Sequence, residues 1–209
     1  ALVLALVMSM SLVTISNADF KDADKIDYNE AVDVMNAVGV LIGDENGNFN
    51  PKENLTRAQA AKIISYLLLG NKTAEGLAGS GKFTDVAKTS WAAGFVDYCA
   101  AVGVVNGMGN GKFDPNGSLT TLQFAKMLLV ALGYDAKIEG FVGTDWSINV
   151  SAKANQVGLL NGLDVGANAT LTREQAAKMC LNTLKAPLVE YDTKGTTVTV
   201  GGDASVTVG

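Results

Sequence analysis

The sequence predicts an all-α protein built from three helix-loop-helix repeats, and three observations support that prediction. Nearly the same ten residues occur twice, as NLTRAQAAKI from Asn54 and as TLTREQAAKM from Thr170. Apolar residues recur with helical spacing on either side of a loop in the repeats. Each second helix is expected to begin at a threonine that has a glutamine three residues later, the pattern of a capping box, at Thr56, Thr120 and Thr172.

The composition limits the function classes that the chain can serve. The 209 residues are 48% hydrophobic, so the chain can bury a core, and the net charge of −5 argues against a nucleic-acid partner. No histidine is present, which removes Ser-His-Asp and Cys-His nucleophile systems and the usual zinc sites. We therefore expect no catalytic residue, no cofactor and no metal ion. Cys99 and Cys180 make no CxxC motif; they are expected as buried apolar side chains, with one disulfide as the alternative.

Residues 1–18 form an apolar run that ends in Ser16-Asn17-Ala18. An apolar run before a small-residue site is typical of a secretory signal peptide, here without its charged start. A membrane anchor is the alternative, but the run is short for a span. We expect export with cleavage after Ala18, and no membrane contact after that cleavage.

The repeats are expected at residues 19–70, 83–133 and 144–187, with small-residue linkers at 71–82 and 134–143. In the first two repeats a glycine follows the first apolar stripe, where a helix end favours a left-handed residue, at Gly39 and Gly103; Gly158 recurs at the matching place in the third repeat. The first two repeats also share a Gly-x-Phe-x-Pro loop, as GNFNP and GKFDP, which the third repeat lacks.

A single helix pair cannot bury its own apolar stripe, so the repeats must share a core. We expect a pseudo-threefold trimer of helix-loop-helix repeats around a central three-helix bundle, with the first helices in the centre and the second helices outside. Residues 188–209 have a different residue pattern. Val alternates with Thr or Ser between Thr196 and Val208 around Gly201-Gly202, which predicts a hairpin in a short β-prone tail, the start of a further β-rich region or a linker.

The order of these motifs resembles that of the S-layer homology domain, over roughly residues 19–186. The motifs are Phe-x-Asp at Phe20 and Phe83, then Gly-xxx-Gly, Gly-x-Phe-x-Pro and Leu-Thr-Arg-Ala-Gln. The resemblance implies three tandem domains that anchor a surface protein of a Gram-positive cell. It implies non-covalent binding to secondary cell-wall polysaccharide, often through a terminal pyruvylated N-acetylmannosamine, with other S-layer subunits as further partners.

Two arginines directly follow the cap threonines and so lie in the first turn of the second helix, at Arg57 and Arg173. Unpaired amides and the positive end of the helix dipole favour an anion there. A guanidinium fork adds bidentate hydrogen bonds that suit the carboxylate of a pyruvyl group. We therefore expect each decapeptide to build a carboxylate site at a helix start. The second repeat has Thr121 in place of the arginine, so its own site is in doubt.

Other candidate ligand-binding residues belong to the same motifs: Thr56, Gln59, Thr172, Gln175, Asp22, Asp85, Trp91, Gly43 and Gly107. The aspartates are expected to cap the first helix or to bind sugar hydroxyls. The tryptophan could stack on a sugar or pack in the core, and the glycines could turn the chain or admit a ligand. The DENGN segment from Asp44 is expected to be a turn rather than a calcium loop. The lysines that recur six residues after each cap threonine, Lys62, Lys126 and Lys178, are expected to be solvated, with help in binding the carboxylate as the alternative for a lysine near a groove.

Two alternatives to a polysaccharide-binding S-layer anchor remain at this point. The chain could anchor a larger secreted enzyme whose catalytic part lies elsewhere, or it could be a protein–protein adaptor that uses its helical repeats as a docking surface. No paired carboxylates and no nucleophile with its base stand out in these residues, so we expect no catalysis within the chain.

Overall fold

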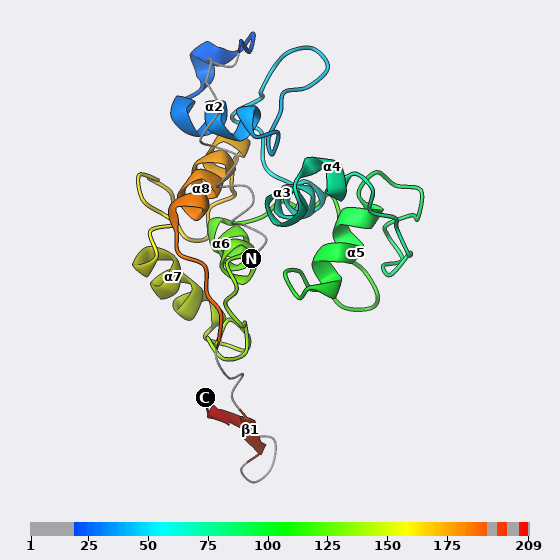
Figure 1. The fold of residues 1–209 in the computed structure, drawn as a ribbon, viewed down its shortest axis with the longest axis vertical. Helices are drawn as coiled ribbons and strands as arrows, with labels where there is room; N and C mark the ends of the chain where they lie inside the picture. The colour runs from blue at the N-terminus through cyan, green and yellow to red at the C-terminus, as the bar shows by residue number, and fades with distance from the viewer. Residues whose placement is uncertain (1–18, 192–195, 200–204, 209) are drawn as a thin grey trace.

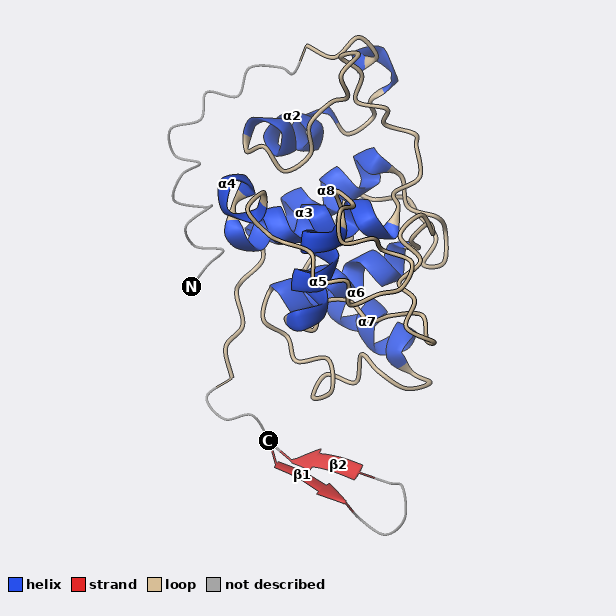
Figure 2. Ribbon diagram, turned by 90° about the vertical axis from the view of Figure 1, so that its right-hand side faces the viewer, coloured by secondary structure: helices blue, strands red, loops and turns tan. Residues whose placement is uncertain are grey.

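A computed structural model describes residues 19–191, 196–199 and 205–208 of the chain. The expected signal peptide at residues 1–18 lies outside the described residues. Within them the protein is helical, as the sequence predicts, apart from one small hairpin (Figures 1 and 2). No helix in the described part is long and apolar enough to cross a membrane.

Each repeat contributes one first helix and one second helix. The first helices are α2 (Asn29–Ala37), α5 (Ala93–Ala101) and α7 (Trp146–Gln156). The second helices are α3 (Arg57–Leu69), α6 (Thr121–Ala131) and α8 (Arg173–Lys185). A 3₁₀ turn, η2 (Ala23–Lys25), precedes α2, and a short helix, α4 (Asn71–Ala74), opens the first linker. The glycines expected after the first helices have positive φ angles, 71° at Gly39 and 76° at Gly103, and Gly158 of the third repeat shares this conformation with a φ of 78°.

The expectation that the first helices form the centre is wrong. The second helices contact one another, α3 with α6 and α6 with α8, and the first helices lie around them (Figure 1). Each first helix packs on the second helix of another repeat: α2 on α8, α5 on α3, and α7 on α6. The apolar stripe of each repeat is therefore buried by its neighbour, and the three contacts close a ring.

The three segments that lead into the second helices meet in a cyclic set of backbone hydrogen bonds. The N–H of Leu55 donates to the carbonyl of Leu171 (2.8 Å), that of Leu171 to Leu119 (2.9 Å), and that of Leu119 to Leu55 (3.1 Å). All three leucines are at most 1% exposed. The leucine before each cap threonine is thus the point where the repeats join, and this junction fixes how each helix start faces the next repeat.

The tail and the second linker pack together after α8. The N–H of Val189 donates to the carbonyl of Leu132 (2.8 Å), and the hydroxyl of Tyr191 donates to Glu139 (2.7 Å). Residues 188–191 therefore belong to the helical body. Farther on, β1 (Thr196–Thr199) and β2 (Ser205–Val208) pair antiparallel, with Thr196 opposite Val208, which confirms the predicted hairpin. The connection between the two strands, residues 200–204, lies outside the described residues.

Candidate functional site

The predicted capping boxes are present at all three second helices. In α3 the N–H of Gln59 donates to the hydroxyl oxygen of Thr56 (3.2 Å), and the N–H of Thr56 donates to the side-chain oxygen of Gln59 (3.0 Å). Thr120 and Thr172 make the same pair of bonds with Gln123 and Gln175. These residues fix where each helix begins and therefore where the next side chain points.

The expected free amides at the helix starts are not available to a ligand. The N–H groups of Arg57 and Ala58 donate to the carbonyls of Gly117 (2.9 Å) and Pro115 (3.0 Å) of the second repeat. In the same way, the N–H of Arg173 donates to Glu53 of the first repeat (2.9 Å). The loop of the neighbouring repeat satisfies the first amides of each helix. The idea that these amides hold an anion is therefore wrong, and any anion must be held by side chains.

The Arg57 side chain lies across the boundary between the first and second repeats. Its Nε donates to the carbonyl of Phe113 (2.8 Å), one terminal nitrogen donates to the carbonyl of Asn106 (2.9 Å), and the guanidinium lies 4.5 Å from the centre of the Phe113 ring. A guanidinium has five N–H donors, so three remain for a ligand. The backbone contacts and the ring hold the fork in a fixed orientation, which favours bidentate binding.

Arg173 repeats this arrangement at the boundary between the third and first repeats. Its Nε donates to the carbonyl of Phe49 (3.0 Å), a terminal nitrogen donates to the carbonyl of Ile42 (3.1 Å), and the guanidinium lies 5.1 Å from the Phe49 ring centre. Burial lowers the pKa of both arginines, against the opposing effect of nearby carboxylates. The structure thus places both predicted arginines in crevices between repeats.

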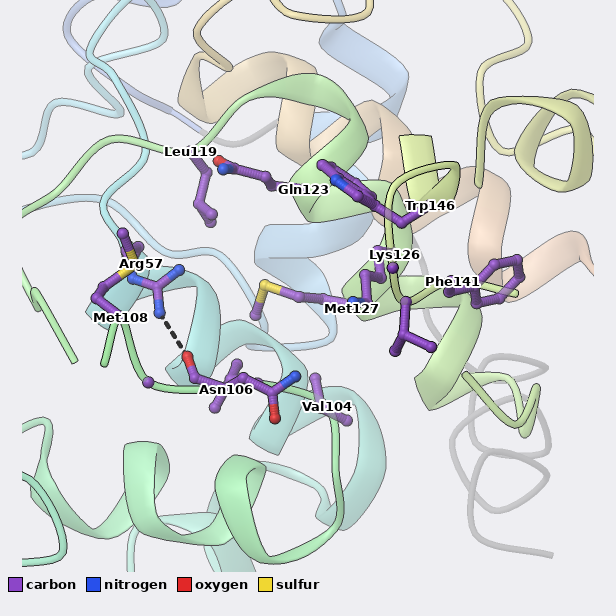
Figure 3. Close-up of a pocket in the computed structure, with 14 residues that line it drawn as sticks. Arg57, Val104, Asn106, Met108, Leu119, Gln123, Lys126, Met127, Phe141 and Trp146 are labelled. Atoms are coloured by element: carbon purple, nitrogen blue, oxygen red, sulfur yellow. Dashed lines mark hydrogen bonds between the residues drawn. The ribbon is translucent and has the colours of Figure 1, made fainter. Parts of the chain in front are cut away.

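The cavity beside Arg57, here called the Arg57 groove, has a volume of about 350 Å³. Its walls include Arg57 from the first repeat, residues 104–108 and helix α6 from the second, residues 141–143 from the second linker, and Trp146 from the third repeat. Figure 3 shows the side chains of Arg57, Gln123, Lys126 and Trp146 around this cavity. The groove combines a guanidinium, an ammonium and an indole ring, which are groups suited to an acidic sugar.

Lys126 gives the Arg57 groove its second positive charge. Its side chain is half-buried, its ammonium lies 5.7 Å from the Trp146 ring centre, and burial lowers its pKa. Within the part of the chain that the structure describes, no carboxylate forms an ion pair with Lys126 or with Arg57. Two cations without a paired carboxylate line one cavity in a protein whose net charge is −5.

The matching cavity beside Arg173, here called the Arg173 groove, has a volume of about 170 Å³. Its walls include Arg173, residues 40–42, and Gln59, Lys62 and Tyr66 of α3. Here the lysine is paired, since the Lys62 ammonium lies 3.0 Å from a carboxylate oxygen of Glu75. Burial acts to lower the pKa of Lys62, but hydrogen bonds with Tyr66 and Glu75 outweigh it and raise that pKa.

The two predicted aspartates hold loops rather than helix starts. The Asp22 carboxylate accepts the N–H groups of Phe49 and Asn50, both at 2.8 Å, and makes no side-chain cap bond to η2. Asp85 accepts the N–H groups of Phe113 and Asp114, again at 2.8 Å. The capping role expected for them is therefore wrong. Each aspartate holds the loop whose phenylalanine carbonyl accepts a hydrogen bond from an arginine. The aspartate therefore acts on the groove through this loop.

The two predicted glycines admit an aromatic ring of their own repeat. A Cβ at Gly43 would lie 2.6 Å from the Phe20 ring, and one at Gly107 would lie 2.8 Å from the Phe83 ring. Gly107 also lines the Arg57 groove. Trp91 is 59% exposed, and neither groove has it in its lining. The Asp44 carboxylate accepts the N–H groups of Asn46 and Asn48 (2.9 Å each), in agreement with a turn.

The structure adds three residues to the predicted set. Lys126 lines the Arg57 groove, which agrees with the alternative role for these lysines rather than with full solvation, and neither Trp146 nor Glu75 is indicated by the sequence. The lysine did give a signal, because it recurs at the same distance from each cap threonine. Glu75 gave none, since it lies in a segment that was expected to be a plain linker, where the structure has α4.

The fold and the grooves define a class of protein: a helical repeat module with arginine-lined crevices between its repeats. The family model of the S-layer homology domain matches residues 19–61 and 82–125, which are the first two repeats up to the start of their second helices. The matched segments do not include the third repeat, whose loop lacks the Gly-x-Phe-x-Pro element.

Similar proteins come from bacterial cell surfaces. A "Cell surface protein" of Thermoanaerobacter kivui is 33% identical over 191 residues, 90% of this chain and 24% of that protein. A "Middle cell wall protein" of Brevibacillus brevis is 29% identical over 175 residues, 82% of this chain and 16% of that protein. A "Cellulosome-anchoring protein" of Acetivibrio thermocellus is 35% identical over 105 residues, 50% of this chain and 23% of that protein. The chain thus spans a quarter or less of these relatives. The matches indicate a location at the cell wall or in an S-layer and support a role in cell-wall anchoring.

Proposed function

We propose that the chain anchors a secreted surface protein non-covalently by binding secondary cell-wall polysaccharide at the Arg57 groove. The bound group is an acidic sugar end, for which a terminal pyruvylated N-acetylmannosamine is the specific candidate. The third helix pair is taken to be a third, divergent S-layer homology domain. The observation that carries the proposal is the pairing of Arg57 and Lys126 in one cavity without a paired carboxylate among the described residues.

The chemistry of the groove suits a pyruvyl ketal on a neutral sugar. The ketal contributes one carboxylate, which the three remaining N–H donors of Arg57 can bind as a fork. Lys126 supplies a second charge in a half-buried site, where charge pairing is stronger than in water. Trp146 offers an aromatic face for the sugar ring beside the same ammonium. Cation and aromatic face together distinguish an acidic sugar from a neutral sugar and from a simple anion.

A calorimetric titration of the whole chain tests the proposal. The methyl glycoside of pyruvylated N-acetylmannosamine is compared with the same glycoside lacking the pyruvyl group, at equal ionic strength. We expect binding of the first and a loss of at least tenfold in affinity for the second, since a charge-assisted hydrogen bond contributes about 1.5–3 kcal/mol. Equal affinity for the two sugars would contradict the carboxylate-based proposal.

A second experiment separates the anchor from the protein–protein adaptor. The chain is mixed with purified cell wall from which all protein has been removed, before and after chemical removal of the pyruvyl groups. An anchor of the proposed kind sediments with the untreated wall and not with the treated wall. An adaptor would sediment with neither, because its partner protein is absent.

A further inference from the structure

The two arginine grooves differ at one structurally equivalent position of the second helix. Ten residues after the cap threonine, α3 has Tyr66, α6 has Val130 and α8 has Asn182. Tyr66 lines the Arg173 groove, and its hydroxyl donates to the carboxylate of Glu75. Val130 has no polar group, so it cannot hold a carboxylate at the corresponding place in the second repeat.

The second repeat has a counterpart of Glu75, and its carboxylate is held elsewhere. Glu75 and Glu139 both lie nineteen residues after their cap threonines, each followed by glycine. Glu75 binds the groove residues Lys62 (3.0 Å) and Tyr66. Glu139 instead binds Lys153 of α7 (3.0 Å) and the hydroxyl of Tyr191 (2.7 Å). One glutamate therefore neutralises the lysine of its groove, while the other leaves Lys126 without a paired carboxylate among the described residues.

The loops over the two grooves add a further difference in the number of nearby carboxylates. The carboxylates of Glu53, Asp44 and Asp22 raise the pKa of Arg173, whereas two carboxylates, those of Asp114 and Asp85, do so for Arg57. At the positions equivalent to Asp44 and Glu53, the second repeat has Met108 and Gly117, which carry no charge. A ligand carboxylate would meet like charges from the loops at both grooves, but at the Arg173 groove it would also meet Glu75 and one more loop carboxylate, which is less favourable.

We propose that Glu75, positioned by Tyr66, closes the Arg173 groove to carboxylates, so that the chain binds one acidic sugar end, in the Arg57 groove. This inference rests on the proposed function and adds a specificity-determining residue to it. The Arg173 groove is then a latent second site: its arginine is oriented correctly, but the charge of its lysine is already compensated.

The test uses the whole chain and the pyruvylated N-acetylmannosamine glycoside in calorimetric titrations. The wild type is expected to bind one sugar, and Arg57→Ala to weaken that binding about a hundredfold. Adding Glu75→Gln to Arg57→Ala is expected to restore a single site, because the amide keeps the size of the side chain and removes its charge. The restored affinity should exceed that of Arg57→Ala by on the order of tenfold. Adding Arg173→Ala to that double variant should remove the restored site again.

The outcomes separate failure of this inference from failure of the proposed function. If the wild type does not prefer the pyruvylated sugar, the proposed function fails and the inference fails with it. If the wild type binds and Arg57→Ala weakens binding about a hundredfold, but the added Glu75→Gln restores no affinity, the inference alone fails. A wild-type stoichiometry of two, with half the sites lost in Arg173→Ala, would also overturn it, because the Arg173 groove would then be open.

Discussion

The Arg57 groove and the Arg173 groove have the same scaffold but different charges. Each arginine donates to two loop carbonyls and lies over a phenylalanine ring, with closely similar distances. The lysine of one groove has no paired carboxylate among the described residues, whereas Glu75 pairs with the lysine of the other. The comparison shows that the Thr-Arg motif places an arginine against two loop carbonyls and a phenylalanine ring in both grooves. Residues outside the motif decide whether the groove carries an excess of positive charge.

The corresponding boundary between the second and third repeats shows what happens when the arginine is absent. Thr121 of the second repeat stands where the other two repeats have arginine, it is 1% exposed, and its hydroxyl donates to the carbonyl of Ala169 (3.4 Å). The carbonyl of Asn161, equivalent to that of Asn106, accepts a hydrogen bond from the Asn182 side chain instead (2.9 Å). A buried amide thus replaces the guanidinium in satisfying the loop. The loop is thus held at this boundary without a positive charge.

The largest effect is expected from removing the arginine of one groove and then of the other. Arg57→Ala should weaken binding of the pyruvylated sugar about a hundredfold, because two charge-assisted hydrogen bonds are lost. Arg173→Ala is the matched control, because it removes the equivalent two carbonyl contacts and ring contact in the Arg173 groove. It should leave the affinity unchanged. A titration of both variants measures the difference, and equal losses would show that the grooves do not differ.

The grooves also differ in what holds their walls together. Glu174, next to Arg173, is 2% exposed; it accepts the N–H of Asp27 (2.7 Å) and pairs with Lys52, so it ties the third repeat to the first. Ala58 and Leu122 occupy its position in the other repeats. Breaking a buried ion pair costs about 3–5 kcal/mol, which we reduce to about 2 kcal/mol because the Lys52 side chain is 53% exposed.

Glu174→Ala is therefore expected to lower the free energy of unfolding by about 2 kcal/mol while the Arg57 groove still binds its sugar. Denaturant unfolding measures the first quantity, and titration well below the midpoint measures the second. Glu174→Gln is the control, since it can still accept the N–H of Asp27 and should lose less stability. A wild-type stability for the alanine variant would show that this contact does not hold the ring closed.

Much of the fold follows from the sequence, because its signals are local and repeated. The capping boxes at Thr56, Thr120 and Thr172 are formed by residues three apart, and the glycines after the first helices need positive φ whatever surrounds them. The order of packing is not local. A helix with an apolar stripe can bury it against any other stripe, so the sequence did not reveal that second helices occupy the centre or that each first helix packs on another repeat.

The features of the candidate site also divide into those that local sequence indicates and those that depend on how the repeats pack. The sequence indicates Arg57 and Arg173, because their position after a cap fixes their direction. It does not show that loop carbonyls occupy the helix amides, since that depends on the cyclic junction of Leu55, Leu119 and Leu171. It also gives no reason to separate Glu75 from Glu139, which have the same spacing and differ only in the partners that the fold brings near them.

The lysines of the two grooves provide a third comparison. Lys126→Met should weaken binding of the pyruvylated sugar about tenfold, since it removes one of two charges and keeps the length of the side chain. Lys62→Met is the matched control and should change affinity little, because Lys62 is already compensated by Glu75. Both variants are titrated with the same glycoside. A larger loss in Lys62→Met than in Lys126→Met would contradict the assignment of the Arg57 groove.

The smallest expected effect is a pH dependence that only one lysine can produce. Burial lowers the pKa of Lys126, whereas the pKa of Lys62 is raised. A ligand carboxylate binds the protonated amine, so affinity is highest below the pKa of Lys126 and falls as pH rises through it. Between pH 7 and pH 9.5 we expect a loss of less than tenfold that begins below the pH at which an ordinary lysine of pKa about 10.4 titrates. The affinity of the Lys126→Met variant should not fall in this way between pH 7 and pH 9.5, whereas that of Lys62→Met should. If the fall persists in Lys126→Met, another group titrates with the ligand, and the ammonium in the Arg57 groove is not what the carboxylate binds.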